Sequence, residues 1–162
     1  MKIMGYLAVA LAVLAVAVVV AGQLGLLSGS APDKLGVTDG RLRPPSRNPN
    51  SVSSQAALYP DHPQKDYAAI APLKYTGDGE AALARLDSML QKEERTVVVR
   101  RAPDYLYAQS STALLKFTDD VEFWLDQAHG VIQVRSASRL GRKDFGVNRA
   151  RIEAIRARFT SN

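Results

Sequence analysis

The chain has 162 residues, a formal net charge of +5 at pH 7 and no cysteine. The lack of cysteine excludes disulfides, thiolate metal sites, a cysteine nucleophile and a lipidated cysteine anchor. The modest positive charge favours solubility and weak attraction to anionic surfaces, and we expect no nucleic-acid partner.

The first 28 residues form an apolar segment. No charged residue occurs between residues 3 and 27, and about 20 apolar residues are enough to cross the hydrocarbon core as a helix. We therefore expect residues 1–28 to be a transmembrane signal anchor that binds the protein to the membrane in a single pass. A cleaved signal peptide is the alternative, with small residues at 20–22 or 28–30 as possible cleavage positions.

The charges around this segment give opposite indications of its orientation. Lys2 and the amino terminus favour a cytoplasmic start and an exported domain. The positive-inside rule would instead keep four basic residues after the segment in the cytoplasm, namely Lys34, Arg41, Arg43 and Arg47. A very short tail before a long apolar run is typical of signal sequences. We expect a single-pass protein of the inner membrane with its soluble domain in the periplasm.

Residues 29–65 are rich in proline and predict a tether. Proline removes backbone donors and restricts its neighbours, which disfavours regular structure. One interpretation is a flexible linker. The other is an ordered loop that is partly docked on the domain through Val52, Leu58 and Tyr59.

Residues 66–162 predict an α+β domain with a mostly antiparallel sheet of four to five strands and two flanking helices. The first helix is expected over residues 78–94, with Asp78 as its cap. Alternation of apolar and polar residues predicts a hairpin over residues 120–136. The second helix is expected over residues 148–159, with Asn148 as its cap.

The hairpin brings an acidic stretch next to a basic one. Residues 104–126 hold five acidic residues and one basic residue, and residues 135–158 hold eight basic residues and two acidic ones. In a structural interpretation, carboxylates and arginines of neighbouring strands pair and fix the fold. In a functional one, the arginines and the N-terminus of the second helix form an anion site, since both attract phosphate or carboxylate.

We predict that these residues surround one polar site. The candidate ligand-binding residues are Arg135, Ser138, Arg139, Asp144, Asn148 and Arg149, with Asp119, Asp120 and Glu122 as their partners. The expected role is a non-catalytic binding or assembly module for an anionic small ligand or a membrane-protein partner. One alternative is an envelope hydrolase with Asp119 or Asp120 as acid–base group. The other is a purely structural charge network. We expect no cofactor, metal ion or catalytic residue.

Several segments resemble the family called domain of unknown function 1499. The resemblance runs over about residues 35–159 and rests on residues 52–55, 105–108, 117–123, 135–141 and 144–149. Many members of this family are small exported or membrane-linked proteins, so the resemblance implies that setting and no particular activity. The family often has two cysteines where this chain has Pro45 and Ser51. Their joint replacement resembles the loss of a disulfide and implies that the region near Ser53 folds onto the domain.

Overall fold

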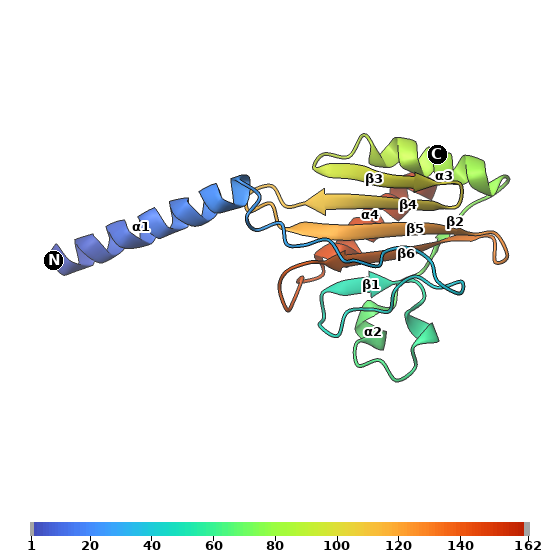
Figure 1. Ribbon diagram of the computed structural model, residues 1–162, viewed down its shortest axis with the longest axis horizontal. Helices are drawn as coiled ribbons and strands as arrows, with labels where there is room; N and C mark the ends of the chain where they lie inside the picture. Colours follow the sequence, from blue (N-terminus) through green and yellow to red (C-terminus); the bar gives the residue numbers. More distant parts are fainter. Residues whose placement is uncertain (1, 161–162) are drawn as a thin grey trace.

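A computed structural model describes residues 2–160, which form one projecting helix and a domain built on an antiparallel sheet (Figure 1). The chain begins with α1 (Lys2–Gln23). The elements that follow are β1 (Ser51–Ser53), η1 (Ala56–Leu58), α2 (Lys65–Ala68), β2 (Leu73–Lys74), α3 (Gly79–Leu90), β3 (Thr96–Ala102), β4 (Tyr105–Ser111), β5 (Thr118–Asp126), β6 (Val131–Ser138) and α4 (Val147–Thr160).

The helix α1 extends away from the domain (Figure 1). Its 22 residues have a mean hydropathy of 2.8 over the most apolar window, so it is long and apolar enough to cross a membrane. Its C-terminal end contacts the turn between β4 and β5. The amide of Gln23 donates to the carbonyl oxygen of Leu114 at 2.8 Å. Gly22 lies so close to the backbone of Leu115 that a Cβ would come within 2.7 Å of it.

The sheet has the strand order β1-β6-β5-β4-β3, and β2 pairs with another part of β6. The α+β class and the predicted hairpin are confirmed, since β5 and β6 pair in antiparallel register from Asp119↔Ser138 to Asp126↔Val131. The sheet has six strands instead of four to five. The additional strands, β1 and β2, have only three and two residues, which is too short for a periodic pattern in the sequence.

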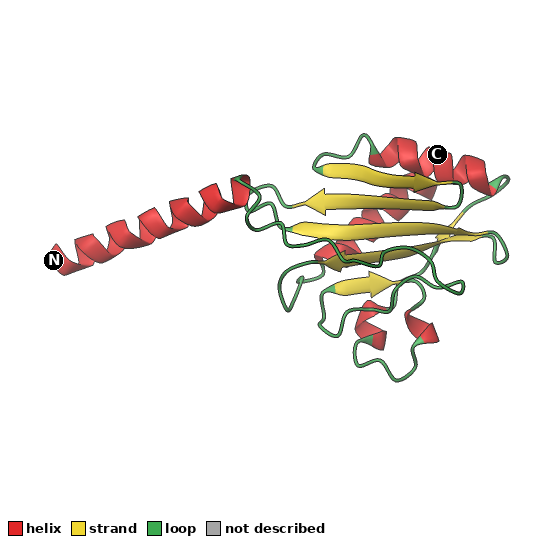
Figure 2. Cartoon of the chain, in the orientation of Figure 1, coloured by secondary structure: helices red, strands yellow, loops and turns green. Residues whose placement is uncertain are grey.

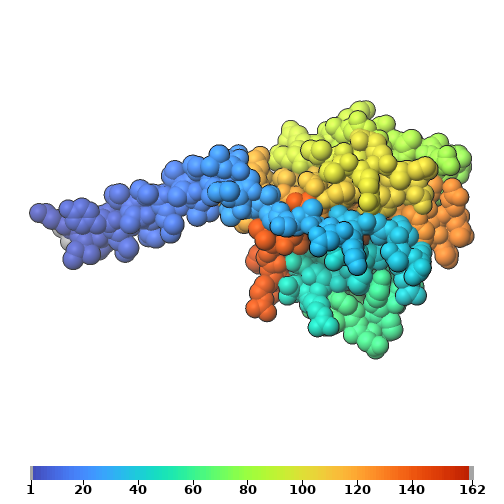
Figure 3. Space-filling view, in the orientation of Figure 1, coloured from blue at the N-terminus to red at the C-terminus, as the bar shows by residue number. Residues whose placement is uncertain are grey.

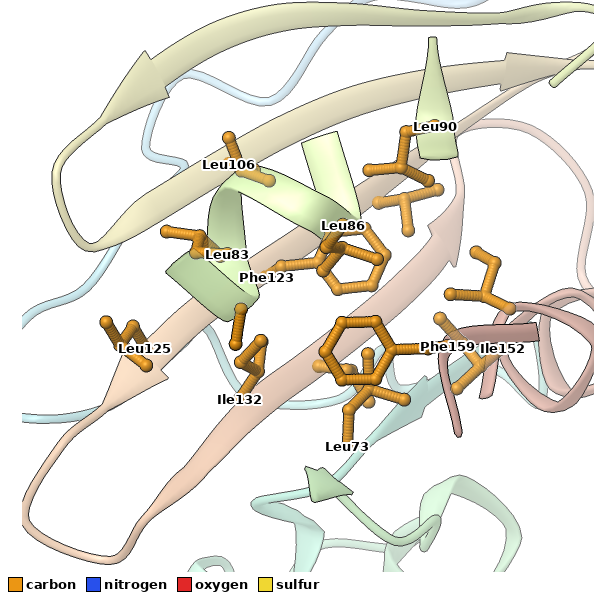
Figure 4. Close-up of a cluster of buried hydrophobic side chains, with 14 of the residues drawn as sticks. Leu73, Leu83, Leu86, Leu90, Leu106, Phe123, Leu125, Ile132, Ile152 and Phe159 are labelled. Carbon is orange, nitrogen blue, oxygen red and sulfur yellow. The ribbon is translucent and has the colours of Figure 1, made fainter. Parts of the chain in front are cut away.

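Both long helices of the domain cover one face of this sheet and bury the main core against it (Figures 2 and 4). Phe123 of β5, Leu86 of α3 and Phe159 of α4 are at most 1% exposed. Asp78 caps α3 as predicted, because its carboxylate accepts from the amide of Ala81 at 2.7 Å. The helix ends at Leu90, the last buried residue of its apolar stripe, and so is shorter than expected.

The proline-rich segment covers the opposite face of the sheet. In Figure 3 the light-blue residues after α1 lie across the front of the domain. Leu42 is buried there against Tyr105 and Tyr107, with Trp124 packed beside them. Val52 is buried in β1, whereas Leu58 is exposed. The segment expected as a tether is therefore ordered over much of its length, and it supplies the third layer of the domain.

The start of α4 differs from its prediction. Asn148 is not the cap, since it lies inside the helix with no exposed surface. Asp144 takes that role by accepting from the backbone amides of Gly146 and Asn148, both at 3.1 Å. The side chain of Asn148 is thereby free to bond across to the sheet.

Candidate functional site

The candidate residues divide between the two faces of the sheet. Successive side chains of a strand point to opposite faces. Asp120 and Glu122 of β5 therefore lie under the proline-rich segment, and Asp119 lies against α4. The single polar site expected from the sequence is two separate clusters in the structure.

The first cluster contains the ion pair of Arg139 with Asp120. The Nε and Nη2 atoms of Arg139 donate to the Asp120 carboxylate at distances of 2.8–3.1 Å. The hydroxyl of Tyr107 donates to the same carboxylate at 2.6 Å. The Asp120 and Arg139 side chains are 2% and 6% exposed. The pair thus has the forked, desolvated geometry in which charge-assisted hydrogen bonds are strong.

Glu122 occupies the centre of this cluster. Its carboxylate accepts from Arg135 Nη1 at 3.2 Å, from the hydroxyl of Tyr105 at 2.7 Å and from the amide of Gly36 at 2.9 Å. Burial, together with the charge of Glu122, raises the pKa of Tyr105, so this hydroxyl remains a donor. The bond to Gly36 ties the proline-rich segment to the sheet.

A cavity of about 350 Å³ lies beside this cluster, between the proline-rich segment and β6. We call it the arginine cavity. It is lined by Ser30, Pro32, Arg43, Pro44, Pro45, Ser46, Arg47, Asp120, Arg135, Ala137, Ser138 and Arg139. Its wall therefore contains four arginines and a single carboxylate.

The charges of the arginine cavity are only partly compensated. Arg139 and Arg135 pair with Asp120 and Glu122. Arg43 and Arg47 make no hydrogen bond or ion pair with any other described residue, which leaves two positive charges unpaired. The Nε of Arg135 is buried and has no partner within residues 2–160. Burial lowers the pKa of Arg135, the charge of Glu122 opposes this, and the nearby charge of Arg43 lowers it further.

The second cluster joins α4 to β6. Asn148 accepts from the Ser136 hydroxyl at 2.6 Å and donates to the Ser138 hydroxyl at 3.0 Å. It also donates to the carbonyl oxygen of Asn50 at 3.1 Å. Arg151 pairs with Asp119 and donates to Ser136 at 2.9 Å. These partners are mutually satisfied, so this cluster holds the helix on the sheet.

Arg149 belongs to neither cluster. Its guanidinium donates to the carbonyl oxygens of Tyr67 and Ala69 at 2.7 and 2.9 Å. It therefore fastens the region of α2 to α4 and does not face the arginine cavity.

Asp144 gives the second cluster a pH dependence. Burial alone would raise the pKa of Asp144, but hydrogen bonds from Tyr67, Asn148 and Gly146 outweigh it and hold the pKa below the usual 3.8. A carboxylate whose pKa is lowered by folding stabilises the fold above its unfolded pKa, and the stabilisation is lost as the pH falls through the folded pKa.

We expect Asp144→Asn to lower the free energy of unfolding by about 1–3 kcal/mol at pH 7, since charged hydrogen bonds are lost. Denaturant unfolding at a series of pH values measures this loss. The difference between the wild type and the variant should stay constant down to about pH 4 and shrink below it. A difference that does not change between pH 7 and pH 3 contradicts this role of Asp144.

The positions of the carboxylates do not favour an acid–base mechanism. Asp119 and Asp120 point to opposite faces, and each is held by an arginine. Asp126 bonds His129 at 2.8 Å. Ser54, near them, donates to Gln133 and not to the histidine. Within residues 2–160, no group of three or more histidine, aspartate or glutamate side chains is placed to hold a metal ion.

Four residues of the first cluster and the arginine cavity were not among the candidates predicted from the sequence: Tyr105, Tyr107, Arg43 and Arg47. Tyr105 and Tyr107 lie opposite Trp124 and Glu122 in the β4–β5 register. Their spacing of two residues was a usable signal for a shared face. Arg43 and Arg47 gave no such signal, because their position depends on how an irregular segment crosses the sheet.

A match to one protein-family model gives the family assignment. A family model described as "Protein of unknown function (DUF1499)" matches residues 41–159, which include the whole sheet, α3 and all but the last residue of α4. No curated protein and no solved structure matches the chain.

Proposed function

The chain belongs to the DUF1499 family, and because the description of this family names no activity, we propose a function from the arginine cavity. The protein is a membrane-anchored, non-catalytic module that binds a small anionic ligand in this cavity. The surplus of positive charge in this cavity carries the proposal. Arg43 lies near the buried guanidinium of Arg135, and no carboxylate pairs with it. An anion between these side chains would compensate the charge of Arg43 and accept a hydrogen bond from the unpartnered Nε of Arg135.

The cavity indicates the chemical class of the ligand. The planar guanidinium group matches the two oxygens of a carboxylate or a phosphate. Serine hydroxyls from Ser30 and Ser46 line the same cavity and can donate to such oxygens. A volume of about 350 Å³ is at the lower end of the range for small-molecule sites. These features favour a small anion, or the anionic group of a larger ligand, over an extended protein surface.

The membrane setting is also part of the proposal. The exposed helix α1 serves as a single-pass anchor, with the domain on the periplasmic side of the inner membrane. Arg43 and Arg47 are two of the bases that argue against export under the positive-inside rule. Both arginines line the arginine cavity, so ligand binding accounts for their presence after the helix. The positive-inside argument against a periplasmic domain is correspondingly weaker.

The test is a thermal-shift titration of the full chain in neutral detergent. The probes are inorganic phosphate, glycerol 3-phosphate, citrate and glucuronate. A ligand at 100 times its Kd stabilises the folded state by about 2.7 kcal/mol. In a chain of this size that raises the Tm by several degrees. We expect at least one of these anions to raise the Tm of the wild type.

The decisive variant is Arg43→Ala. We expect it to lose the anion-induced rise in Tm while its Tm without ligand stays at or slightly above that of the wild type, because Arg43 has no ion pair to lose. Arg41→Ala is the matched control, since Arg41 is exposed, two residues away and outside the cavity. If no anion shifts the wild type, or if Arg43→Ala keeps the full shift, the proposed function is wrong.

A further inference from the structure

The loop between β6 and α4 carries a large apolar side chain that nothing in the fold covers. Phe145 is 92% exposed. Its backbone has φ = 52°, a left-handed conformation that a bulky residue adopts only at a cost. An exposed phenylalanine on strained backbone contributes nothing to the core, so it points to a contact outside the domain.

The loop is held firmly in this conformation. Asp144, directly before Phe145, is buried and accepts from Tyr67 and from the amides of Gly146 and Asn148. The amide of Asp144 also donates to the carbonyl oxygen of Pro49 at 3.3 Å. Phe145 is therefore presented on a fixed support, which lowers the entropy lost on binding.

Basic residues surround Phe145. A hollow of about 620 Å³ beside it is lined by Arg47, Arg142 and Lys143 together with Asn48, Pro49 and Gln64. No acidic residue lines this hollow. Arg142 and Lys143 are exposed and form no ion pair with any described residue. The hollow is thus positively charged and open beside an apolar tip.

The loop lies at the end of the domain from which α1 emerges (Figures 1 and 3). Just after α1, Gly29 packs so closely on Arg139 and Leu140 that a Cβ would come within 3.0 Å of both. Further exposed apolar residues flank this end: Leu140 in the same loop, and Leu114 in the β4–β5 turn that contacts α1.

We propose that this end of the domain rests on the bilayer that α1 crosses, with Phe145 inserted at the interface and the basic hollow on the phosphate of an anionic lipid. Apolar side chains beside bases are the combination that binds such surfaces. The inference rests on the proposed anchoring by α1, but not on ligand binding in the arginine cavity.

The experiment uses the full chain in lipid nanodiscs and the fluorescence of a single tryptophan. Trp124, the only tryptophan of the chain, is replaced by phenylalanine, and Phe145→Trp is added. The nanodiscs contain phosphatidylcholine and phosphatidylglycerol, with or without brominated acyl chains that quench tryptophan at short range. We expect the brominated lipid to quench at least half of the emission of this variant.

Ala128→Trp in the same background is the matched control, because residue 128 is exposed at the opposite end of the β5–β6 hairpin. We expect no quenching there. If the emission of Phe145→Trp is the same in brominated and unbrominated nanodiscs, the proposal is wrong. This holds even if the emission spectrum is shifted to the blue, because such a shift without quenching shows that the tryptophan is buried against protein and not in lipid. Co-elution with the nanodisc reports separately whether α1 anchors the chain.

A separate experiment tests the role of the basic residues Arg142 and Lys143. In nanodiscs of phosphatidylcholine alone, and in the variant that adds Arg142→Glu and Lys143→Glu, we expect the quenching of Phe145→Trp to fall by half or more. Quenching that is unchanged in both cases overturns the assignment of the hollow to an anionic lipid.

Discussion

Glu122→Ala is expected to destabilise the domain by about 3–5 kcal/mol, the range observed when one partner of a buried ion pair is removed. Glu122 is 0% exposed. The substitution leaves the buried guanidinium of Arg135 without its counter-charge. It also leaves the hydroxyl of Tyr105 and the amide of Gly36 without an acceptor. Because the stability of a whole domain is typically 5–15 kcal/mol, this loss would remove a large fraction of the free energy of unfolding.

Denaturant unfolding of the full chain in detergent, followed by the fluorescence of Trp124, measures this loss. Glu122→Gln retains an acceptor and should lose clearly less. Glu94→Ala is the surface control, since Glu94 is 85% exposed in its pair with Arg95 and such pairs contribute at most about 1 kcal/mol. A Glu122→Ala variant as stable as Glu94→Ala would contradict the central position of Glu122.

Asn148→Ala is expected to cost about 3 kcal/mol, because several buried polar groups each lose a hydrogen bond at once. These include the hydroxyl of Ser136, the carbonyl oxygen of Asn50 and one hydrogen bond of Arg151. The higher helix propensity of alanine offsets only a few tenths of a kcal/mol. Since Asn148 links α4 to the sheet, we expect α4 to detach before the strands unfold.

Hydrogen exchange measured by mass spectrometry, together with denaturant unfolding, tests this expectation. Residues 147–160 should lose protection in Asn148→Ala, while β4 and β5 retain most of theirs. Glu153→Ala on the same helix is the control, because its pair with Arg156 is half-exposed. Equal protection of α4 in both variants would show that Asn148 does not hold the helix.

The local parts of the fold were predictable from the sequence. Alternation in β5 and β6 defined the hairpin, and the capping residue Asp78 with its apolar stripe defined α3. These signals work because they depend on neighbouring residues and on the periods of strands and helices. The family resemblance, confirmed by the match to residues 41–159, identified the same blocks but added no chemistry.

The arrangement of the site was harder to predict. The opposite directions of Asp119 and Asp120 follow from the two-residue period of a strand, so the sequence alone is enough to place them on different faces. The approach of Arg43 to Arg135 joins positions far apart in the chain and depends on the path of a segment with little regular structure. No local rule predicts such a contact, so the arginine cavity emerges only in three dimensions.

The most direct measurement follows the side-chain Nε–Hε signals of arginine by NMR in the ¹⁵N-labelled full chain in detergent, during titration with inorganic phosphate and, separately, with acetate. We predict that the Arg135 signal shifts and saturates with at least one of the two anions, and that this shift disappears in Arg43→Ala. Arg101, which pairs with Asp87 on the surface, should not follow it. An Arg135 signal that stays unchanged, or moves only in parallel with Arg101, would contradict anion binding in the arginine cavity.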